Sequence, residues 1–275
     1  MKVAVLGLGI IGSQWVQHLE SDGVLSAAWN RSPKEGMPRY TCQVVDAVGS
    51  ASIVHLCLAD PPAVRSTLMS IKEVLTPNHL VIQSSTIAPS SASEFYEIVS
   101  APGALYVEAP FTGSLPAAQA RDLVFYVGAT DSKALSAAKG YLGRLSKKVV
   151  EIGSERQAAI IKLAMNLQIA AAMQALSEAL TLSRSAEIPD DLFFDAFRLN
   201  ASFSGVAALK EKKLRAGDFS PQFSVKHMAK DLRLLKAECV QAKAPFLTEL
   251  QTIFSEAIEQ GFSNDDFASL IRLLA

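Results

Sequence analysis

The sequence has few cysteines and no excess of charge of either sign. Its three cysteines, Cys42, Cys57 and Cys239, are far apart, with no CxxC pair and no histidine at metal-ligand spacing. We therefore expect buried, reduced thiols and no bound metal. The 27 acidic residues nearly balance the 26 basic ones, so no net field attracts the chain to nucleic acid or to an anionic membrane. Small molecules and further copies of the chain are the expected partners.

Long hydrophobic runs are also missing. The longest uncharged helical stretch, Leu163 to Ser177, contains Asn166, Gln168 and Gln174 and falls short of the roughly 20 apolar residues that a membrane span needs. The amino-terminal apolar stretch is interrupted by glycines and is not followed by the small-residue cleavage site of a signal peptide. These absences predict a cytoplasmic protein with a buried helix in this region.

The amino-terminal half of the chain alternates short apolar runs with helical patterns, which is typical of a parallel sheet covered by helices. One of these helices is expected to open with a capping box formed by Ser91 and Glu94. The pattern predicts an α/β fold with a doubly wound sheet. The expected strands are residues 2–8, 25–30, 52–58, 79–85, 104–110, 123–128 and 147–153, with helices at 13–21, 62–74 and 91–99 between them.

After Ile152 only helical patterns follow. The sequence therefore predicts two domains, a dinucleotide-binding Rossmann domain over residues 1–154 and an all-helical domain over residues 155–275. Ligand sites tend to form in the cleft between two domains. The expected helices of the second domain are residues 155–186, 191–198, 222–241, 246–260 and 265–274.

A GxGxxG motif, GLGIIG, lies directly between the first expected strand and the first expected helix. In dinucleotide-binding proteins the first glycine permits a tight turn, the second lets the backbone approach a pyrophosphate, and the third lets helix and strand pack closely. The alternative is a glycine-rich turn without a ligand. The residues expected to bind cofactor here are Gly7, Gly9, Ile10, Ile11 and Gly12.

The end of the second expected strand, WNRS, indicates which cofactor is preferred. An NAD-specific site places Asp or Glu there to bind the adenine ribose, whereas this chain has Asn30 and Arg31. A guanidinium suits the 2′-phosphate of NADP(H). We therefore expect NADP(H) to be preferred, with NAD(H) possible. The alternative is that Arg31 is a solvated loop residue.

Five motifs in this order resemble the β-hydroxyacid dehydrogenase family, which includes 3-hydroxyisobutyrate dehydrogenases and glyoxylate and succinic semialdehyde reductases. The resemblance covers essentially the whole chain. It implies a Rossmann domain, a helical domain involved in oligomer contacts, and a homodimer or homotetramer. The motifs are GLGIIG, QSSTIAP at 83–89, VEAPFTGS at 107–114, KLAMN at 162–166 with Glu178 in the same helix, and FSVKHMAKDLRLL at 223–235.

By matching position, Lys162 corresponds to the catalytic lysine of that family. An ammonium beside a carbonyl oxygen stabilises the negative charge that hydride transfer leaves there, and it supplies the proton. Asn166 follows four residues later, on the same face of a helix, where it can hold the substrate or orient the lysine. The alternative for Lys162 is an exposed cation near the start of a helix.

The remaining expected site residues follow the strands or belong to the last motif. Ser84, Ser85 and Thr86 end a strand on the ligand-binding side of a doubly wound sheet, although Ser and Thr often serve only as caps. Thr112 and Gly113 suit a substrate carboxylate, or else form only a tight turn. We expect Ser85, Thr112, Gly113 and Lys230 to contact substrate, and Leu58, Ala59, Asp60, Thr86 and, by the resemblance, Lys230 to contact cofactor, with Asp231 structural.

Departures from the family pattern leave the substrate open. Where the family usually reads DAPVSGG, this chain has EAPFTGS, which changes the loop at Phe111 and Ser114, and Arg121 follows. Arg121 either holds a second acidic group or faces water, and we expect water.

The leading prediction is an NADP(H)-dependent oxidoreductase for a small aldehyde acid or β-hydroxy acid, of the glyoxylate and succinic semialdehyde reductase type. Three alternatives remain: a 3-hydroxyisobutyrate-type dehydrogenase, an imine reductase-like enzyme and a non-catalytic NADP-binding module. Imine reductases usually carry Asp or Tyr at the position of Lys162, and non-catalytic relatives lose the lysine. Its presence argues against both.

Overall fold

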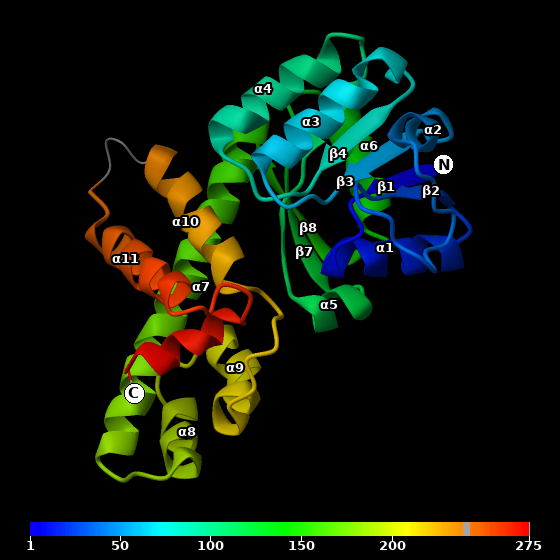
Figure 1. Cartoon of the computed structure of the whole chain (residues 1–275). Helices are drawn as coiled ribbons and strands as arrows, with labels where there is room; N and C mark the ends of the chain where they lie inside the picture. The colour runs from blue at the N-terminus through cyan, green and yellow to red at the C-terminus, as the bar shows by residue number, and fades with distance from the viewer. Residues whose placement is uncertain (239–242, 275) are drawn as a thin grey trace. The chain divides into compact units, whose positions relative to one another are not determined.

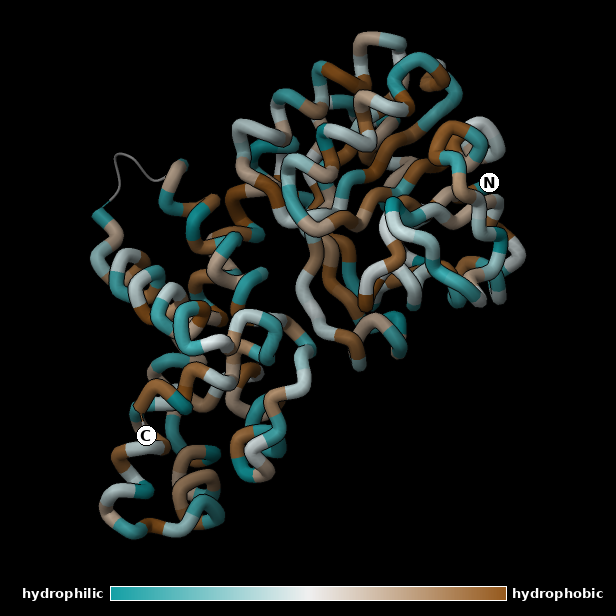
Figure 2. The backbone as a smooth tube through the Cα atoms, viewed as in Figure 1, coloured by the Kyte–Doolittle hydropathy of each residue, from teal (hydrophilic) through white to brown (hydrophobic). Residues whose placement is uncertain are grey.

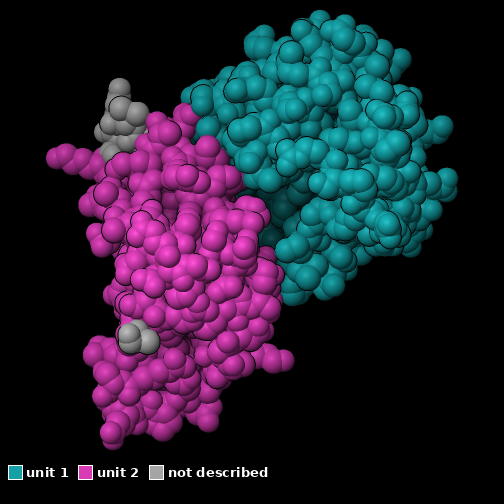
Figure 3. All heavy atoms as spheres, viewed as in Figure 1, with its two compact units in different colours: residues 1–162 teal, residues 163–275 magenta. Residues whose placement is uncertain are grey.

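The computed structural model describes residues 1–238 and 243–274 of the chain. The chain forms two compact units, Met1–Lys162 and Leu163–Ala275, which are coloured separately in Figure 3. The division falls inside a long helix that begins at Glu155, where the sequence predicted the second domain to begin. Each unit is described by itself below.

The N-terminal unit is a single eight-stranded sheet with helices on both faces (Figure 1). Its strand order is β2-β1-β3-β4-β5-β7-β6, with β8 paired to β7. The strands are β1 (Val3–Leu6), β2 (Leu25–Trp29), β3 (Ile53–Leu56), β4 (Leu80–Gln83), β5 (Leu105–Glu108), β6 (Phe111–Thr112), β7 (Leu123–Gly128) and β8 (Ser146–Gly153). The helices are α1 (Ile10–Ser21), α2 (Val44–Gly49), α3 (Pro61–Ile71), η1 (Lys72–Val74), α4 (Pro89–Ser100), α5 (Leu115–Gln119) and α6 (Ser132–Leu142).

The predicted doubly wound sheet is confirmed, with one difference in strand direction. Strands β1 to β5 run parallel, whereas β7 is antiparallel to β5 and β6. The chain returns from β6 to β7 through the short helix α5. This connection is too short for the crossover that parallel pairing requires, so the chain forms an antiparallel pair there.

Strands β1, β3 and β4 are buried along their whole length, which explains why they are continuous apolar runs. Along β1, Val3 and Val5 belong to one core cluster, with residues of α1 and α6. Ala4 and Leu6 belong to the other, with residues of α3 and α4. In Figure 2 the strands are mostly in the hydrophobic colours, while the surrounding helices are mixed.

Helix α4 begins at Pro89, and its N-cap is Ala88, which makes no side-chain capping bond. The predicted capping box of Ser91 and Glu94 is therefore wrong, and Glu94 instead pairs with Arg65. Proline explains the earlier start, because its fixed φ suits the first turn of a helix and the N–H it lacks has no partner there.

The second unit is all helical, as predicted. After α7 (Glu155–Ser185) come α8 (Asp190–Arg198), α9 (Gly205–Ala216), α10 (Val225–Glu238), α11 (Pro245–Glu259) and η2 (Phe267–Leu274). Helix α9 was not predicted, because its KEKK run weakens the apolar periodicity. The last predicted α-helix is instead the 3-10 helix η2. The predicted end of the α10 helix at Gln241 lies outside the described residues.

The cysteines differ from expectation in one case. Cys42 is exposed, so its predicted burial is wrong, whereas Cys57 is half-buried. Cys42 follows β2 in a surface loop, where no strand or helix covers it. Cys239 lies outside the described residues.

Helix α7 (Glu155–Ser185) is long and apolar enough to cross a membrane by length and composition alone. A core helix of a globular unit passes the same test. Five of its residues, Leu163, Ala170, Met173, Leu176 and Leu180, belong to the core cluster of the helical unit. This burial supports its prediction as a core helix.

Candidate active site

The glycine-rich loop between β1 and α1 has room for a ligand at one of its three glycines. A Cβ added at Gly7, whose φ is 106°, lies 2.2 Å from the Cys57 carbonyl oxygen, and one at Gly12 lies 2.0 Å from the Gly7 carbonyl oxygen. A Cβ added at Gly9 meets nothing within 4 Å. Gly7 and Gly12 are therefore required by the fold itself, whereas the space at Gly9 is open to a ligand at the start of α1.

Side chains that follow β2 hold this loop. The Leu8 N–H donates to Asn30 Oδ1 at 3.0 Å. Lys34 Nζ donates to the Leu8 carbonyl oxygen and, at 2.8 Å, to Ser13 Oγ. Asn30 thus shapes the loop, a role that sequence reasoning did not assign, and Lys34 adds a cation that was not predicted. Arg31 is exposed.

The loop after β3 is tied to the end of β4. The Leu58 N–H donates to Ser85 Oγ at 2.7 Å, and Ser85 is buried. Asp60 Oδ1 caps α3 by accepting from the Ala63 N–H at 2.8 Å. Ser85 and Asp60 therefore have structural bonds in addition to their predicted contacts. β1 and β3 are parallel neighbours, and from this pair the sheet continues to β2 on one side and to β4 on the other. The two loops therefore flank the topological switch point, where such sheets bind ligands.

Lys162 lies near the start of α7, in a part of the helix that packs on the N-terminal unit. Ala159, three residues earlier, belongs to the core cluster that contains Ile87. Arg156 Nη1 donates to the Pro89 carbonyl oxygen at 3.4 Å. The first turns of α7 are thus anchored to the segment after β4, which contains Thr86. Lys162 itself is half-buried, which contradicts the alternative of a fully exposed cation.

The predicted substrate loop after β5 has a glycine in a conformation that other residues rarely adopt. Gly113 has φ 120°, and a Cβ there lies 2.7 Å from the Leu123 side chain. Thr112 is half-buried beside it. Phe111 packs edge-on against Trp15, with ring centroids 5.4 Å apart. Position 113 therefore requires glycine on steric grounds, and the Thr112 hydroxyl lies next to it in the chain.

We had expected Arg121 to face water, but it binds other groups of the protein instead. Its guanidinium binds both carboxylate oxygens of Asp22, at 2.9 and 2.8 Å, and it donates to the carbonyl oxygens of His18 and Arg144. This bonding lowers the pKa of Asp22. Arg121 therefore joins the loop after α5 to the end of α1, a role that required the tertiary structure to find.

The site residues of the helical unit form a buried polar group. Asn166 Nδ2 donates to Asp231 Oδ2 at 2.6 Å, and Lys230 Nζ lies 2.9 Å from Asp231 Oδ1. Asn166 and Asp231 are each 1% exposed. Asp231 therefore holds both predicted site residues, which is more specific than the structural role expected for it.

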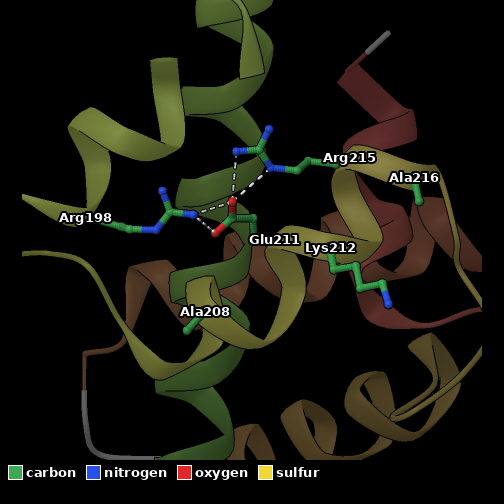
Figure 4. Close-up of a pocket in the computed structure, with 6 residues that line it drawn as sticks. All are labelled: Arg198, Ala208, Glu211, Lys212, Arg215 and Ala216. Carbon is green, nitrogen blue, oxygen red and sulfur yellow. Dashed lines mark hydrogen bonds and ion pairs between the residues drawn. The ribbon is translucent and has the colours of Figure 1, made fainter. Parts of the chain in front are cut away.

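The helical unit also has two surface pockets, but neither is lined by a predicted site residue. The larger, of about 540 Å³, is shown in Figure 4. There Arg198 and Arg215 both bind Glu211. The charges of both arginines are therefore paired with that carboxylate, and Lys212 is a further cation in the lining.

Models of two protein families match the chain. The NAD-binding domain of 6-phosphogluconate dehydrogenase matches residues 2–153. The NAD-binding domain of NADP-dependent 3-hydroxyisobutyrate dehydrogenase matches residues 157–274.

Individual proteins are similar over nearly the whole chain. An uncharacterized oxidoreductase of Synechocystis is 28% identical, over 98% of this chain and 97% of that protein. Glyoxylate/succinic semialdehyde reductase 2 of Arabidopsis thaliana is 24% identical, over 100% of this chain and 79% of the relative. Among solved structures, 3-hydroxyisobutyrate dehydrogenase of Mycobacterium tuberculosis with L-serine has a TM-score of 0.89 at 24% identity, over 99% and 98% of the two chains.

Proposed function

Because the chain belongs to the β-hydroxyacid dehydrogenase family of NAD(P)-dependent oxidoreductases that act on CH–OH groups, we propose that it reduces a small aldehyde acid with NADPH. The observation that carries this proposal is the half-buried Lys162 on a helix anchored beside the carboxyl end of β4. Glyoxylate and succinic semialdehyde are the model substrates.

The glycine-rich loop fits a dinucleotide. The open space at Gly9 lies at the N-terminus of α1, where unpaired N–H groups and the helix dipole favour the negative charge of a pyrophosphate. Gly7 and Gly12 leave no room for a side chain. The exposed Arg31 and the nearby Lys34 supply positive charge for a 2′-phosphate. On these grounds NADP(H) is the proposed cofactor, with NAD(H) as a weaker substitute.

Lys162 is the proposed proton donor. When bound, the reduced nicotinamide supplies a hydride to the carbonyl carbon of the substrate. The Lys162 ammonium stabilises the negative charge that develops on the carbonyl oxygen and then donates its proton there. In the oxidative direction the neutral amine takes that proton back.

Asn166 and Lys230 assist from the helical unit in this proposal. Asn166 follows Lys162 by one helical turn, on the same face of α7. Asp231 fixes the amide of Asn166 and the ammonium of Lys230, which limits the number of positions these groups can take. In the N-terminal unit, the Thr112 hydroxyl and the Gly113 N–H suit the carboxylate of the substrate.

Oxidation of NADPH by a panel of substrates tests this function. Absorbance at 340 nm is followed with glyoxylate, succinic semialdehyde, 2-keto acids and cyclic imines, and with 3-hydroxyisobutyrate plus NADP⁺ in the reverse direction. We expect the highest kcat/KM with an aldehyde acid. A preference for 3-hydroxyisobutyrate would favour a 3-hydroxyisobutyrate-type dehydrogenase, and a preference for an imine would favour an imine reductase-like enzyme. Tight NADPH binding without turnover of any substrate would favour a non-catalytic module.

A second copy of the chain is the proposed partner. The helical unit exposes Leu182, Leu192 and Leu199, whose relative exposures are 72%, 60% and 90%. Where large apolar side chains remain exposed, they are candidates for an interaction surface. A homodimer or homotetramer is therefore proposed, and sedimentation equilibrium of the wild type and of a Leu192→Asp variant tests it. A monomeric wild type at micromolar concentration would rule it out.

A further inference from the structure

A group of buried polar residues links the carboxyl ends of three neighbouring strands in the N-terminal unit. Glu108 ends β5 and is 0% exposed. Its Oε1 accepts from Gln83 Nε2 at 2.8 Å, and its Oε2 accepts from the Tyr106 hydroxyl at 2.7 Å. Gln83 ends β4 and is also 0% exposed. None of these residues has a role in the proposed reaction.

The side-chain amide of Gln83 connects Glu108 to Ser85 by hydrogen bonds. Its Nε2 donates a second bond to the Ser85 carbonyl oxygen at 2.8 Å, and its Oε1 accepts from the Ser85 N–H at 2.6 Å. Both backbone groups of Ser85 are thus held by one side chain. Ser85 Oγ in turn accepts from the Leu58 N–H at 2.7 Å, so the connection extends from β5 through β4 to the loop after β3.

Burial favours the neutral form of the Glu108 carboxyl, although the hydrogen bonds from Tyr106 and Gln83 act in the opposite direction on its pKa. Burial raises its pKa well above the ordinary value, and the negative charge of Glu155 raises it further. In the described part of the chain no cation is within ion-pair distance of Glu108. An isolated buried carboxylate would be very costly, whereas a neutral acid accepts a hydrogen bond from Gln83 as an amide carbonyl does.

We propose that Glu108 is a positioning residue, a buried side chain that orients the Gln83 amide and, through Ser85, fixes the backbone of Leu58 at the cofactor loop. It touches neither cofactor nor substrate. The inference rests on the proposed function only in that Leu58 to Asp60 are taken to contact the cofactor.

Three variants distinguish this positioning role from a requirement for a negative charge on Glu108. Glu108→Gln keeps the oxygen that accepts from Gln83 Nε2, places an amide N–H group beside the Tyr106 oxygen as a donor, and has no titratable group. Glu108→Leu leaves one Gln83 hydrogen without an acceptor, and Ser85→Ala removes the acceptor of the Leu58 N–H. Since an unsatisfied buried donor weakens its surroundings, we expect Glu108→Leu and Ser85→Ala to raise the Kd for NADPH by about tenfold or more. Glu108→Gln should stay within about twofold of the wild type.

A variant of another buried polar pair controls for general destabilisation. Tyr141 donates or accepts a 2.8 Å bond with His55 in the same unit. His55 also bonds Ser84 Oγ, so Tyr141→Phe removes a buried bond close to Ser85 without removing a bond of Ser85 itself. Tyr141→Phe should lower the melting temperature and leave the Kd unchanged. All binding is measured by NADPH fluorescence, without substrate, at a temperature where circular dichroism shows every variant to be folded.

The outcomes distinguish this inference from the proposed function. A wild-type protein that does not bind NADPH would overturn the proposed function. If the wild type binds and the folded Glu108→Leu variant binds equally well, only the positioning role is overturned. A Glu108→Gln variant as impaired as Glu108→Leu would also overturn it, because an ionised carboxylate would then be required.

Discussion

Individual side chains at this site are held by neighbours that set what each can do. Asp231 binds Asn166 and Lys230, and Asn30 binds the glycine loop. The proposed reaction needs one proton donor. Lys162 is the residue proposed for this role, and it lies on a helix whose first turns are anchored to the N-terminal unit.

Replacing Lys162 by alanine should reduce turnover while leaving cofactor binding nearly intact. Loss of a general acid costs about 10² to 10⁴ in rate, and the lysine has no proposed contact with the adenine half of the cofactor. Steady-state kcat and the NADPH Kd from fluorescence measure the two effects. Lys236→Ala, at an exposed position of α10, is the control. Full activity of Lys162→Ala would remove this lysine from the mechanism.

Arg31 offers a test of cofactor preference. A charge-assisted bond to a 2′-phosphate is worth roughly 1.5–3 kcal/mol, so Arg31→Ala should lower the ratio of kcat/KM for NADPH over NADH by about 10- to 100-fold. Arg39→Ala is a suitable control, since this exposed arginine pairs with Glu20 instead. An unchanged ratio would show that Arg31 does not bind the 2′-phosphate of NADPH.

At the scale of secondary structure elements, the turn from β1 into α1 contains glycines that folding requires and one glycine that only ligand binding would require. Gly7 and Gly12 are required by close packing, and Gly9 is not. Substitution of Gly9 should therefore leave the fold intact and test ligand binding alone.

Gly9→Ala and Gly12→Ala should consequently differ. Gly9 has φ −68°, which alanine adopts easily, so its variant should keep the wild-type melting temperature and lose NADPH affinity. In Gly12→Ala the new Cβ collides with the Gly7 carbonyl oxygen, and overpacking costs about 1–3 kcal/mol or more. Thermal unfolding and NADPH fluorescence distinguish the two. Normal NADPH affinity in Gly9→Ala would mean that the pyrophosphate does not lie there.

For the molecule as a whole, the two units have separate cores and need not respond alike to acid. His55 is fully buried in the N-terminal unit, stacked on Trp15 with ring centroids 4.3 Å apart. Burial lowers the pKa of His55 from 6.5 to about 3, so the histidine stays neutral in the folded unit. Both tryptophans, Trp15 and Trp29, lie in this unit, and their fluorescence therefore reports on it alone.

Acidification should destabilise the N-terminal unit through His55. Below pH 6.5 the unfolded chain binds a proton that the folded unit does not, so this contribution to stability is present above pH 6.5 and is lost as the pH falls towards about 3. His55 contributes a slope of about 1.4 kcal/mol per pH unit. The raised pKa of Glu108 contributes a slope of opposite sign, so the difference between the wild type and a His55 variant isolates the histidine. Urea unfolding followed by tryptophan fluorescence at pH 7, 6 and 5 measures it. His55→Gln should lose less stability over the same range, and equal losses would contradict the prediction.

The sequence by itself determined the strands β1 to β5, the long helix α7 and the glycine turn, because burial on both sheet faces and steric demands at glycine are local and leave periodic patterns. Only the tertiary structure revealed the antiparallel return of β7, the Asp22 partner of Arg121 and the network around Glu108. Each of these depends on contacts between residues distant in the chain, and pairing across such distances leaves no regular spacing for a single sequence to show.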